Sequence, residues 1–218
     1  MAAVKDKYDF DYTRIELIGP SFSQLVHTDE PWVRHEFKIV VPVDVMRDES
    51  VEAGRMTVYK LNYSVMSLWG LSLWTAFDDF SDETARCYDV VFDEKEEIRK
   101  PFWHEYYGQE GYLCNDFHFL SRIEIDEEFK GHDLAGIATR IYFENFANGN
   151  DVAYLKAFPL QHEATNDDKP YKRTFKGSEK ACFEKLSKYN AKLGFRRIGK
   201  TNHFFFVVDD FLRKNGSV

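Results

Sequence analysis

The sequence has few cysteines, no long apolar run and no excess of basic residues, and each shortage excludes a class of protein. The three cysteines, Cys87, Cys114 and Cys182, lie far apart and form no CxxC pair. Such usage argues against a disulfide framework or a zinc ribbon and for a reducing compartment. The apolar-rich run from Ser64 to Phe77 has 14 residues, with a glycine and several serines inside. A membrane-spanning helix needs about 20 apolar residues, so we expect no membrane segment.

Acidic residues outnumber basic ones, 37 to 29, for a formal net charge of −8. A surface that follows nucleic-acid phosphates needs a basic face, so bulk RNA or DNA is not the expected partner. The first ten residues, MAAVKDKYDF, lack the apolar segment of a secretory signal. Together with the cysteine usage, this predicts a cytoplasmic protein. The seven histidines form no HExxH motif, so no metal site is expected.

Apolar residues make up 44% of the 218 residues and aromatic residues 17%, which is enough to build a sizeable core. The length fits one large domain. We therefore expect a single domain over residues 1–218 with three parts. Residues 1–66 hold N-terminal strands, residues 67–112 a helical and loop insertion, and residues 113–218 a βαβ unit, a late helix and closing strands.

The first 66 residues carry the alternation of apolar and polar residues that is typical of strands. It runs over Tyr8–Gly19, Trp32–Val45 and Arg55–Met66, and the polar segment Met46–Gly54 predicts a hairpin turn between the last two. Beyond residue 68 apolar residues instead recur at helical spacing, which predicts two short helices. Ser81 is the expected N-cap of the second.

The second half has a more regular pattern. Phe117–Asp126 predicts a strand, Ala135–Asn148 a helix and Asp151–Phe158 a buried parallel strand, which together form a βαβ unit. Ser178–Lys192 predicts a further helix capped by Gly194, and two closing strands follow it.

The stretch EEFKGHDLAG, Glu127–Gly136, turns the chain from strand to helix. The first turn of a helix leaves backbone N–H groups unpaired, and the helix dipole adds partial positive charge. A glycine in the preceding loop lets the backbone approach a phosphate closely. The stretch therefore predicts an anion site, with an ordinary strand–helix turn as the alternative.

Longer segments resemble the GNAT N-acetyltransferase superfamily. The segment SRIEIDEEFKGHDLAGIATRIY, Ser121–Tyr142, resembles its coenzyme-A loop. The run KLGFRRIG, Lys192–Gly199, is similar to its late helix-turn-strand. The run YLKAFPLQ, Tyr154–Gln161, is similar to a segment of one poorly characterised bacterial branch. The resemblance covers the chain from about Ser64 to its end.

This resemblance implies an α+β GNAT fold, a twisted mixed β-sheet with a central splay between two parallel strands and helices on both faces. The two strands would be Phe117–Asp126 and Asp151–Phe158. The implied activity is that of an acetyl-CoA-dependent N-acetyltransferase, in which a primary amine attacks the thioester directly. No cysteine or serine lies in a recognisable nucleophile motif, which agrees with direct attack. The expected partners are acetyl-CoA and an unidentified amine acceptor, and a homodimer is the common default.

The superfamily places the coenzyme pyrophosphate on the loop and helix start, and the pantetheine arm beside the preceding strand. The backbone of Ile123 and Ile125 would therefore pair with pantetheine. The resemblance implies pyrophosphate contacts from the loop residues Lys130, Gly131, His132, Asp133, Leu134, Ala135 and Gly136.

Many members of the superfamily use a tyrosine as the acid for the thiolate, and often a glutamate or a water as the base for the amine. Tyr189 is the candidate acid here, although it also fits a core aromatic residue. Glu124, His118 and Asp116 are the candidate bases, and each also fits an ordinary solvated strand residue. Alternation places Glu124 and His118 on one face of their strand.

Two positions depart from the superfamily pattern. Asp133 replaces a loop glycine, and a carboxylate ~4 Å from a phosphate costs on the order of 4 kcal/mol at an effective dielectric constant of about 20. Asn190 occupies the usual tyrosine position, four residues before Gly194. These departures support the alternative of a catalytically degenerate GNAT-fold protein that binds coenzyme A or another protein. An unrelated α+β binding module is a third interpretation.

Two further segments bear on ligands. The aromatic segment Pro101–Tyr112 precedes the coenzyme strand, and we expect the acceptor pocket there. The basic segment Lys169–Lys180 follows the second parallel strand. It is either a contact for the adenosine 3′-phosphate or an ordinary surface loop.

Overall fold

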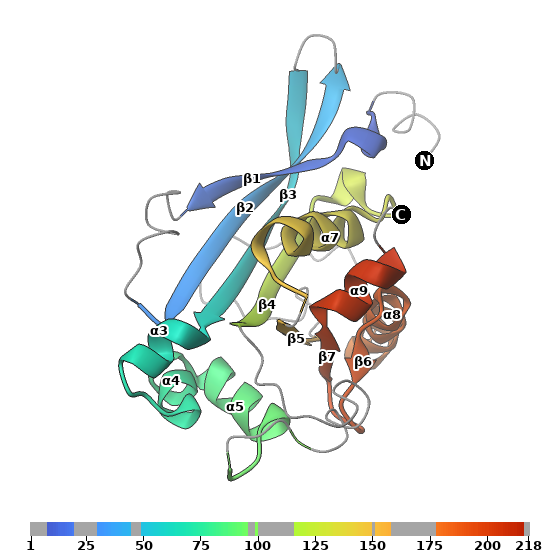
Figure 1. Cartoon of the computed structure of the whole chain (residues 1–218). Coiled ribbons are helices and arrows are strands. Elements are labelled where there is room, and N and C mark those ends of the chain that lie inside the picture. Colours follow the sequence, from blue (N-terminus) through green and yellow to red (C-terminus); the bar gives the residue numbers. More distant parts are fainter. Residues whose placement is uncertain are drawn as a thin grey trace, which may run out of the picture.

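The computed structural model describes residues 8–19, 30–44, 49–95, 99, 116–149, 151–157 and 178–215. Within these residues seven strands form one sheet in the order β1-β2-β3-β4-β5-β7-β6 (Figure 1). The strands are β1 (Arg14–Gly19), β2 (Trp32–Asp44), β3 (Glu49–Asn62), β4 (Asp116–Ile125), β5 (Val152–Lys156), β6 (Arg196–Arg197) and β7 (His203–Val207). β4 and β5 pair in parallel, and the other neighbouring strands are antiparallel. The predicted α+β class with a mixed sheet is confirmed.

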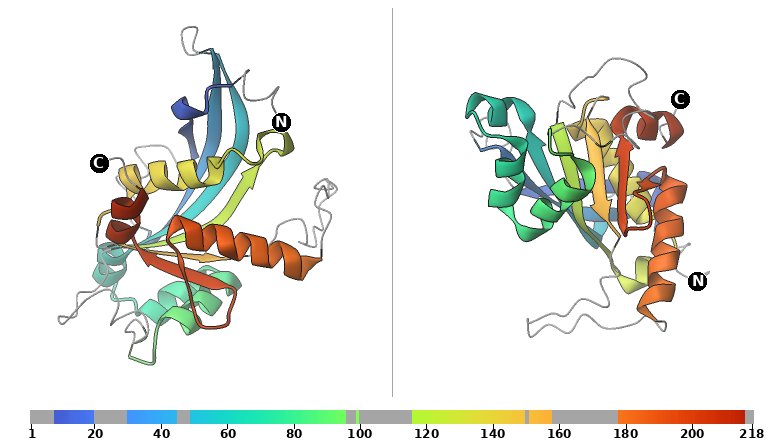
Figure 2. Two further views of the ribbon diagram at one scale, coloured as in Figure 1. Left: turned by 90° about the vertical axis from the view of Figure 1, so that its right-hand side faces the viewer. Right: turned by 90° about the horizontal axis from the view of Figure 1, so that it is seen from below.

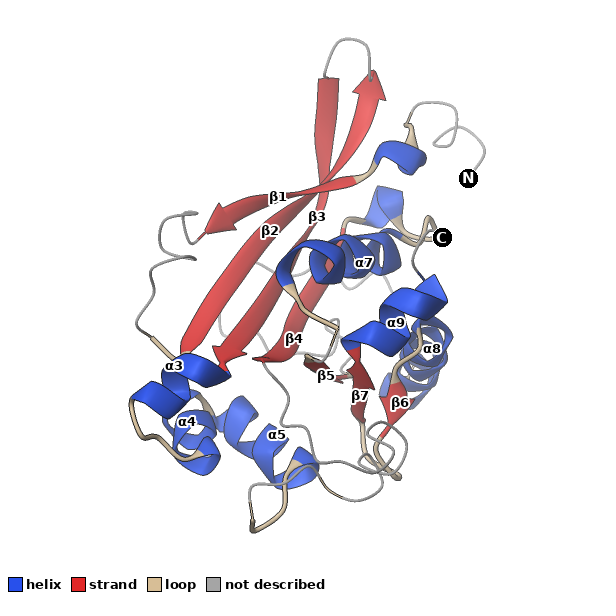
Figure 3. Cartoon of the chain, viewed as in Figure 1, coloured by secondary structure: helices blue, strands red, loops and turns tan. Residues whose placement is uncertain are grey.

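Helices cover both faces of this sheet, as Figures 2 and 3 show. They are α3 (Tyr63–Leu68), α4 (Leu73–Phe80), α5 (Asp82–Val91), α7 (Leu134–Phe146), α8 (Glu179–Leu193) and α9 (Val208–Asn215), with 3-10 turns η1 (Phe10–Tyr12) and η3 (Glu127–Phe129). On one face Phe77 and Cys87 pack from α4 and α5. On the other, Tyr142, Leu193 and Phe211 pack from α7, α8 and α9. The expectation of helices on both faces is confirmed. None of the helices in the described ranges has the length and apolar character to cross a membrane.

The central strands are apolar on both sides because helices cover both sides. In β7, Phe204 and Phe206 pack against the core of α7, α8 and α9, while Phe205 and Val207 pack against that of α3, α4 and α5. This explains why the strand is a continuous run of apolar residues rather than an alternating one.

β2 and β3 form the predicted antiparallel hairpin, but β3 begins earlier than predicted. Phe37 lies opposite Met56 in this pair. β3 begins at Glu49, so Glu49–Gly54, predicted as part of a polar turn, is strand. Charged side chains of this strand end stay at the surface in ion pairs, as Glu52 and Arg55 do at 2.7 Å. A polar strand end gives the same signal in the sequence as a turn.

β3 also ends earlier than predicted, at Asn62, where helix α3 begins. The Asn62 side chain accepts the backbone N–H of Val65 at 3.1 Å and so caps the helix. The prediction extended the strand to Met66 and missed this cap. The predicted cap at Ser81 is confirmed, since Ser81 and Thr84 form a capping box at the start of α5.

The parallel pairing of β4 with β5 is short. Phe117 to Leu120 lie opposite Val152 to Leu155. β4 then continues to Ile125 beside β3. Among the described residues, no strand pairs with the other edge of residues 121–125.

Ser121 interrupts the regular pairing of β4 with β3. The residues on either side of it pair with consecutive residues of β3, so Ser121 is the extra residue of a β-bulge. The bulge reverses the alternation beyond it. Ile123 packs on the same core as Leu120, and Glu124 therefore points to the other face. The prediction that Glu124 and His118 share one face is wrong for this reason.

Candidate functional site

The stretch predicted as an anion site has the expected strand-loop-helix structure. β4 leads through η3 into a loop with two left-handed residues, Gly131 at φ 92° and Asp133 at φ 59°, and then into α7. Asp133 is the N-cap of α7, but its side chain makes no capping hydrogen bond. The Asp133 side chain therefore accepts no hydrogen bond from the backbone N–H groups at the first turn of α7, where the helix dipole is positive.

Asp133 is instead held by Tyr189 of α8. The Tyr189 hydroxyl donates to Oδ1 of Asp133 at 2.8 Å. A Cβ atom on Gly136 would lie 3.0 Å from this oxygen and 2.9 Å from Cδ2 of Leu193. α7 and α8 can approach this closely because residue 136 is glycine. The carboxylate thus lies against the first turn of α7, where helices bind anions.

Partial burial raises the pKa of the Tyr189 phenol far above its ordinary value, and the charge of Asp133 adds to the effect. The phenol therefore keeps its proton and stays a hydrogen-bond donor. The two residues are 56 positions apart in the chain, and the pair was not predicted from the sequence. The helical spacing of Leu186, Tyr189 and Leu193 was a signal for it, because it places Tyr189 on the core-facing side of its helix. A tyrosine there needs a hydrogen-bond partner for its hydroxyl.

The other polar side chains of the loop are engaged within the protein. Nζ of Lys130 lies 2.5 Å from Oε2 of Glu127. The His132 ring stacks on Phe10, with 4.0 Å between the ring centroids. An anion at this loop would compete with Glu127 for Lys130, and the backbone N–H of Gly136 already bonds to the Tyr189 hydroxyl. The remaining predicted pyrophosphate contacts offer no polar side chain: Gly131, Leu134, Ala135 and Gly136.

The backbone of Ile123 and Ile125 faces the edge of β4 that β5 leaves unpaired. The backbone N–H of Asp126 donates to the carbonyl of Ala53 in β3 at 2.9 Å. Backbone groups of successive strand residues point to alternate edges. Glu124 therefore also faces β3, and Ile123 and Ile125 face the opposite edge. Pairing of that edge with pantetheine stays a prediction.

Two of the candidate bases are held in ion pairs. Glu124 pairs with Arg122 on the sheet face away from α7. Asp116 pairs with Lys60 at 2.9 Å. The structure does not bring Glu124 to the side of Tyr189, and its role as a base stays a prediction. Within the described ranges, no three His, Cys, Asp or Glu side chains are grouped to hold a metal ion.

His118 is fully buried in a chain of hydrogen bonds. Its Nε2 lies 3.0 Å from Oδ2 of Asp151 and its Nδ1 3.0 Å from the Tyr142 hydroxyl, which lies 3.2 Å from Nδ1 of His35. An ionised carboxylate only accepts, so His118 donates to Asp151, Tyr142 to His118, and His35 to Tyr142. Burial lowers the pKa of His118, which keeps the ring neutral. In this position His118 supports the fold, and its role as a base stays a prediction.

Stability should fall between pH 7 and pH 5 because His35 is buried in its neutral form. Burial lowers the pKa of His35 to about 4, and repulsion from a proton on His118 and from the charge of Lys60 acts in the same direction. The unfolded chain, with an ordinary histidine pKa of about 6.5, binds the proton first. The stabilisation is therefore present above pH 6.5 and is lost as the pH falls toward 4.

This one group should cost about 2 kcal/mol of unfolding free energy between pH 7 and pH 5. Urea denaturation at the two pH values measures the loss. His35→Gln carries no titratable group and should lose about 2 kcal/mol less over the same interval. An equal loss in the variant and the wild type would show that His35 is not the source.

Two polar atoms of α8 lack a hydrogen-bond partner among the described residues. They are Oγ of Ser187 and Nδ2 of Asn190, and both are buried. Together with Phe183 these residues lie along one side of the helix, because they are spaced by four and three positions. Buried polar atoms are almost always paired, so these two mark a place where a further group is expected.

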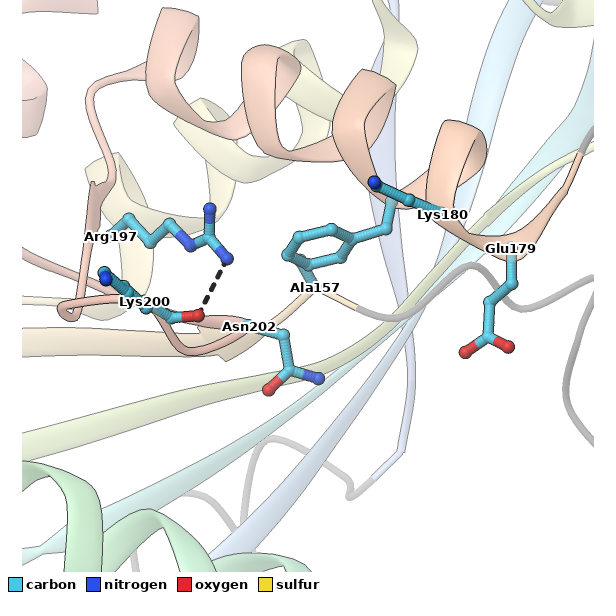
Figure 4. A pocket seen from close by; sticks show the side chains of 7 residues that line it. Ala157, Glu179, Lys180, Arg197, Lys200 and Asn202 are labelled. Carbon is cyan, nitrogen blue, oxygen red and sulfur yellow. Dashed lines mark hydrogen bonds between the residues drawn. The ribbon is translucent and has the colours of Figure 1, made fainter.

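A pocket of about 400 Å³ opens where β5 ends (Figure 4). Arg197 and Lys200 lie at one end of it and Glu179 at the other. Glu179 and Lys180 end the basic segment that was predicted from the sequence, and Arg197 lies in the run Lys192–Gly199, but no common pocket was predicted for them. The predicted acceptor segment Pro101–Tyr112 and residues 169–177 lie outside the described residues. The pocket is lined by Ala157, Glu179, Lys180, Phe183, Arg197, Lys200 and Asn202.

No protein-family model matches the chain, and no curated protein matches it. A solved structure that does match is described as "The crystal structure of KacTA-DNA complex". The match covers 92% of this chain and 96% of that chain at 11% sequence identity, with a TM-score of 0.41. A TM-score this low does not show a shared fold, so no residue role is transferred from that protein.

Proposed function

We propose that the chain is an acetyl-CoA-dependent N-acetyltransferase of the GNAT type. The observation that supports this most is the continuous path from β4 to α7. The edge of residues 121–125 that β5 leaves unpaired runs into the loop with Gly131 and Asp133 in left-handed geometry and ends at α7. An unpaired strand edge binds an extended arm of amide groups, and a helix start binds phosphate. Coenzyme A carries both groups in one molecule.

In this proposal the two parallel strands splay after Leu120 and Leu155, where their pairing ends. The pantetheine arm pairs with Ile123 and Ile125, and the pyrophosphate lies on the loop Lys130–Gly136. The acetyl thioester then lies where β4 and β5 splay apart, beside the pocket that begins at Ala157.

The chemistry needs no covalent enzyme intermediate. The acceptor amine attacks the thioester carbonyl, and most of the rate comes from positioning and from N–H groups that polarise the carbonyl. Tyr189 can give a proton to the thiolate only after it leaves Asp133. Nδ2 of Asn190, without a partner among the described residues, is a second hydrogen-bond donor for the thiolate. With Glu124 on the other face of the sheet, water is the better candidate for the base.

Titration with acetyl-CoA should show binding in the micromolar range. At 100 times the dissociation constant, binding stabilises the folded state by about 2.7 kcal/mol. The melting temperature should then rise by roughly 5–10 °C for a chain of this size. Calorimetry with acetyl-CoA, CoA and desulfo-CoA measures the affinity. No heat and no shift at millimolar coenzyme would contradict the proposal.

A second candidate is a GNAT-fold protein that has lost catalysis and serves as a coenzyme- or protein-binding module. The Asp133 carboxylate favours it, because a negative charge held by Tyr189 against the start of α7 opposes a phosphate there. Binding of acetyl-CoA without turnover of any amine would support this candidate. Asp133 is therefore the residue whose exchange separates the two.

A further inference from the structure

The pocket at the end of β5 is positively charged, although the chain as a whole is acidic. Among the described residues, Lys180, Arg197 and Lys200 line it together with the carboxylate of Glu179, whereas the whole chain has a formal net charge of −8. Figure 4 places Glu179 at the end away from Arg197 and Lys200. The pocket also lies at the first turn of α8, whose dipole adds partial positive charge. The local field therefore favours an anion.

Arg197 is held in place to meet an anion. Its Nε donates to the Thr201 carbonyl and its Nη2 to the Lys200 carbonyl, the latter at 3.0 Å. Its guanidinium carbon lies 5.0 Å from the centroid of the Phe183 ring. In the described part of the chain Nη1 makes no hydrogen bond, so its N–H groups are available. A guanidinium already fixed by backbone carbonyls loses little freedom when it binds a carboxylate or phosphate.

One side of α8 joins this pocket to the proposed coenzyme site. Phe183 lines the pocket, and Ser187 and Asn190, whose buried polar atoms lack partners among the described residues, follow along the same side. Lys180 and Tyr189 are nine positions apart on α8, which is roughly 14 Å along its axis. The outer end of the pocket, at Lys180, is thus separated from the start of α7, whereas Phe183 lies closer to Tyr189 along the helix. The pocket lies at the end of β5, where the proposed function puts the reacting thioester.

We infer that this pocket binds a carboxylate or phosphate group of the acceptor, so that the acceptor is an amine that also carries an anion. An amino acid or an aminoalkyl phosphate has this chemistry, and a polyamine does not. The assignment to the acceptor rests on the proposed function, whereas anion binding by the pocket does not. In the transfer, the amine nitrogen bonds to the acetyl carbon, the C–S bond breaks, and the proton that the amine loses is balanced by the one that the coenzyme thiolate takes up. The anionic group fixes the amine and does not react.

Acceptors that differ only in the anionic group test this inference. Each amino acid is compared with the amine that lacks its carboxylate, for example phenylalanine with phenethylamine. We expect kcat/KM to be about 10-fold or more higher for the acid. Arg197→Gln should lower kcat/KM for the acid by about 10- to 100-fold and leave that for the plain amine unchanged. Equal effects on both acceptors, or a preference for the plain amine, would overturn the inference.

Lys185→Gln is the matched control, since Lys185 is an exposed charge of α8 outside the pocket. This variant should leave kcat/KM unchanged for both the acid and the plain amine. Lys200→Gln is the second pocket variant, in case the turn that Arg197 braces does not fold without it, and it should affect the acid only. Arg197→Lys keeps the charge without the planar fork and should retain part of the preference.

Titration with inorganic phosphate, without coenzyme, separates failure of the pocket from failure of the proposed function. Phosphate should bind about 10-fold more weakly to Arg197→Gln than to the wild type or Lys185→Gln. If phosphate behaved in this way and acetyl-CoA did not bind at all, the anion site would be supported and the proposed transferase function would be wrong. If phosphate did not bind detectably, or bound Arg197→Gln as well as the wild type, the inference of an anion site in the pocket would be wrong. This would hold whether or not acetyl-CoA binds. If Arg197→Gln weakened CoA but not dephospho-CoA, the bound anion would be the coenzyme 3′-phosphate, and the acceptor assignment would fall.

Discussion

Replacing Asp151 with alanine should lower the free energy of unfolding by about 3–5 kcal/mol. The carboxylate is fully buried. It accepts from the backbone N–H of Asp116 at 3.1 Å, the backbone N–H of Asn148 at 2.8 Å and Nε2 of His118 at 3.0 Å. Alanine would remove the acceptor of these three donors, of which His118 is fully buried and the two backbone groups are partly buried. Each buried group left unsatisfied costs about 1–3 kcal/mol. Since domains are stable by only about 5–15 kcal/mol, the loss would be a large share of the total.

The position of Asp151 explains why its loss would reach the proposed site. Its carboxylate ties the start of β4, through Asp116, to the turn after α7, through Asn148, and Val152 begins β5 directly after it. These contacts hold the two parallel strands together at the end where they pair. The unpaired edge of β4 beyond Ser121 depends on that anchoring.

Equilibrium urea denaturation of the wild type and Asp151→Ala measures the effect. Asp151→Asn keeps the shape but turns one acceptor into a donor, and it should cost about 1–3 kcal/mol. Asp79→Ala removes an exposed acid of α4 and should change stability by less than about 0.5 kcal/mol. If Asp151→Ala lowered the free energy of unfolding no more than Asp79→Ala did, the hydrogen bonds of Asp151 would contribute nothing to stability.

Replacing Asp133 with glycine should tighten the binding of coenzyme A by about 10- to 100-fold. The carboxylate lies against the start of α7, and at ~4 Å from a phosphate it would oppose binding by up to about 4 kcal/mol. The hydrogen bond from Tyr189 and the exposure of Asp133 reduce that cost. The gain in affinity should therefore correspond to only part of the roughly 4 kcal/mol. Asp133 also has φ 59°, a left-handed geometry that glycine adopts without steric cost.

Calorimetric titration of four variants with CoA separates these causes. Asp133→Asn removes the charge and keeps the side chain, so it should give most of the gain. Tyr189→Phe removes the hydrogen-bond donor to the Asp133 carboxylate but leaves its charge, so it should give no gain in CoA affinity. Glu128→Gln removes an exposed acid in the same stretch and reports the effect of net charge alone. A gain in Asp133→Gly with no amine turnover in any variant would favour the binding module. Wild-type binding that no Asp133 variant improves would mean that the carboxylate lies outside the path of the pyrophosphate.

Much of the second half could be predicted from the sequence. The strand at 117–126, the loop at Glu127–Gly136 and the helix that follows it agree with β4, η3 and α7 to within about two residues. The capping residues Ser81 and Gly194 were also predicted, and Gly194 has φ 110° at the end of α8. Turn chemistry and the change of apolar period are local, so a short window of sequence contains them.

The candidate site was less accessible to prediction. The bulge at Ser121 has no local signature in the sequence, yet it decides that Glu124 and His118 point to opposite faces. The Asp133–Tyr189 hydrogen bond and the chain from His35 to Asp151 each join residues from distant parts of the chain. The basic pocket likewise combines the start of α8 with the β6–β7 turn.

Local sequence was enough to predict the order of strands and helices in the second half, the caps at Ser81 and Gly194 and the strand-to-helix turn at Glu127–Gly136. Backbone preference and apolar period act over a few residues, so a short window contains these signals. Three features follow from tertiary contacts instead: the partner of each buried polar group, the face that each β4 side chain takes and the place where positive charge gathers. These depend on strand register, on one inserted residue and on the close approach of α7 and α8 at Gly136. Such contacts form between segments far apart in the chain, where no local pattern records them.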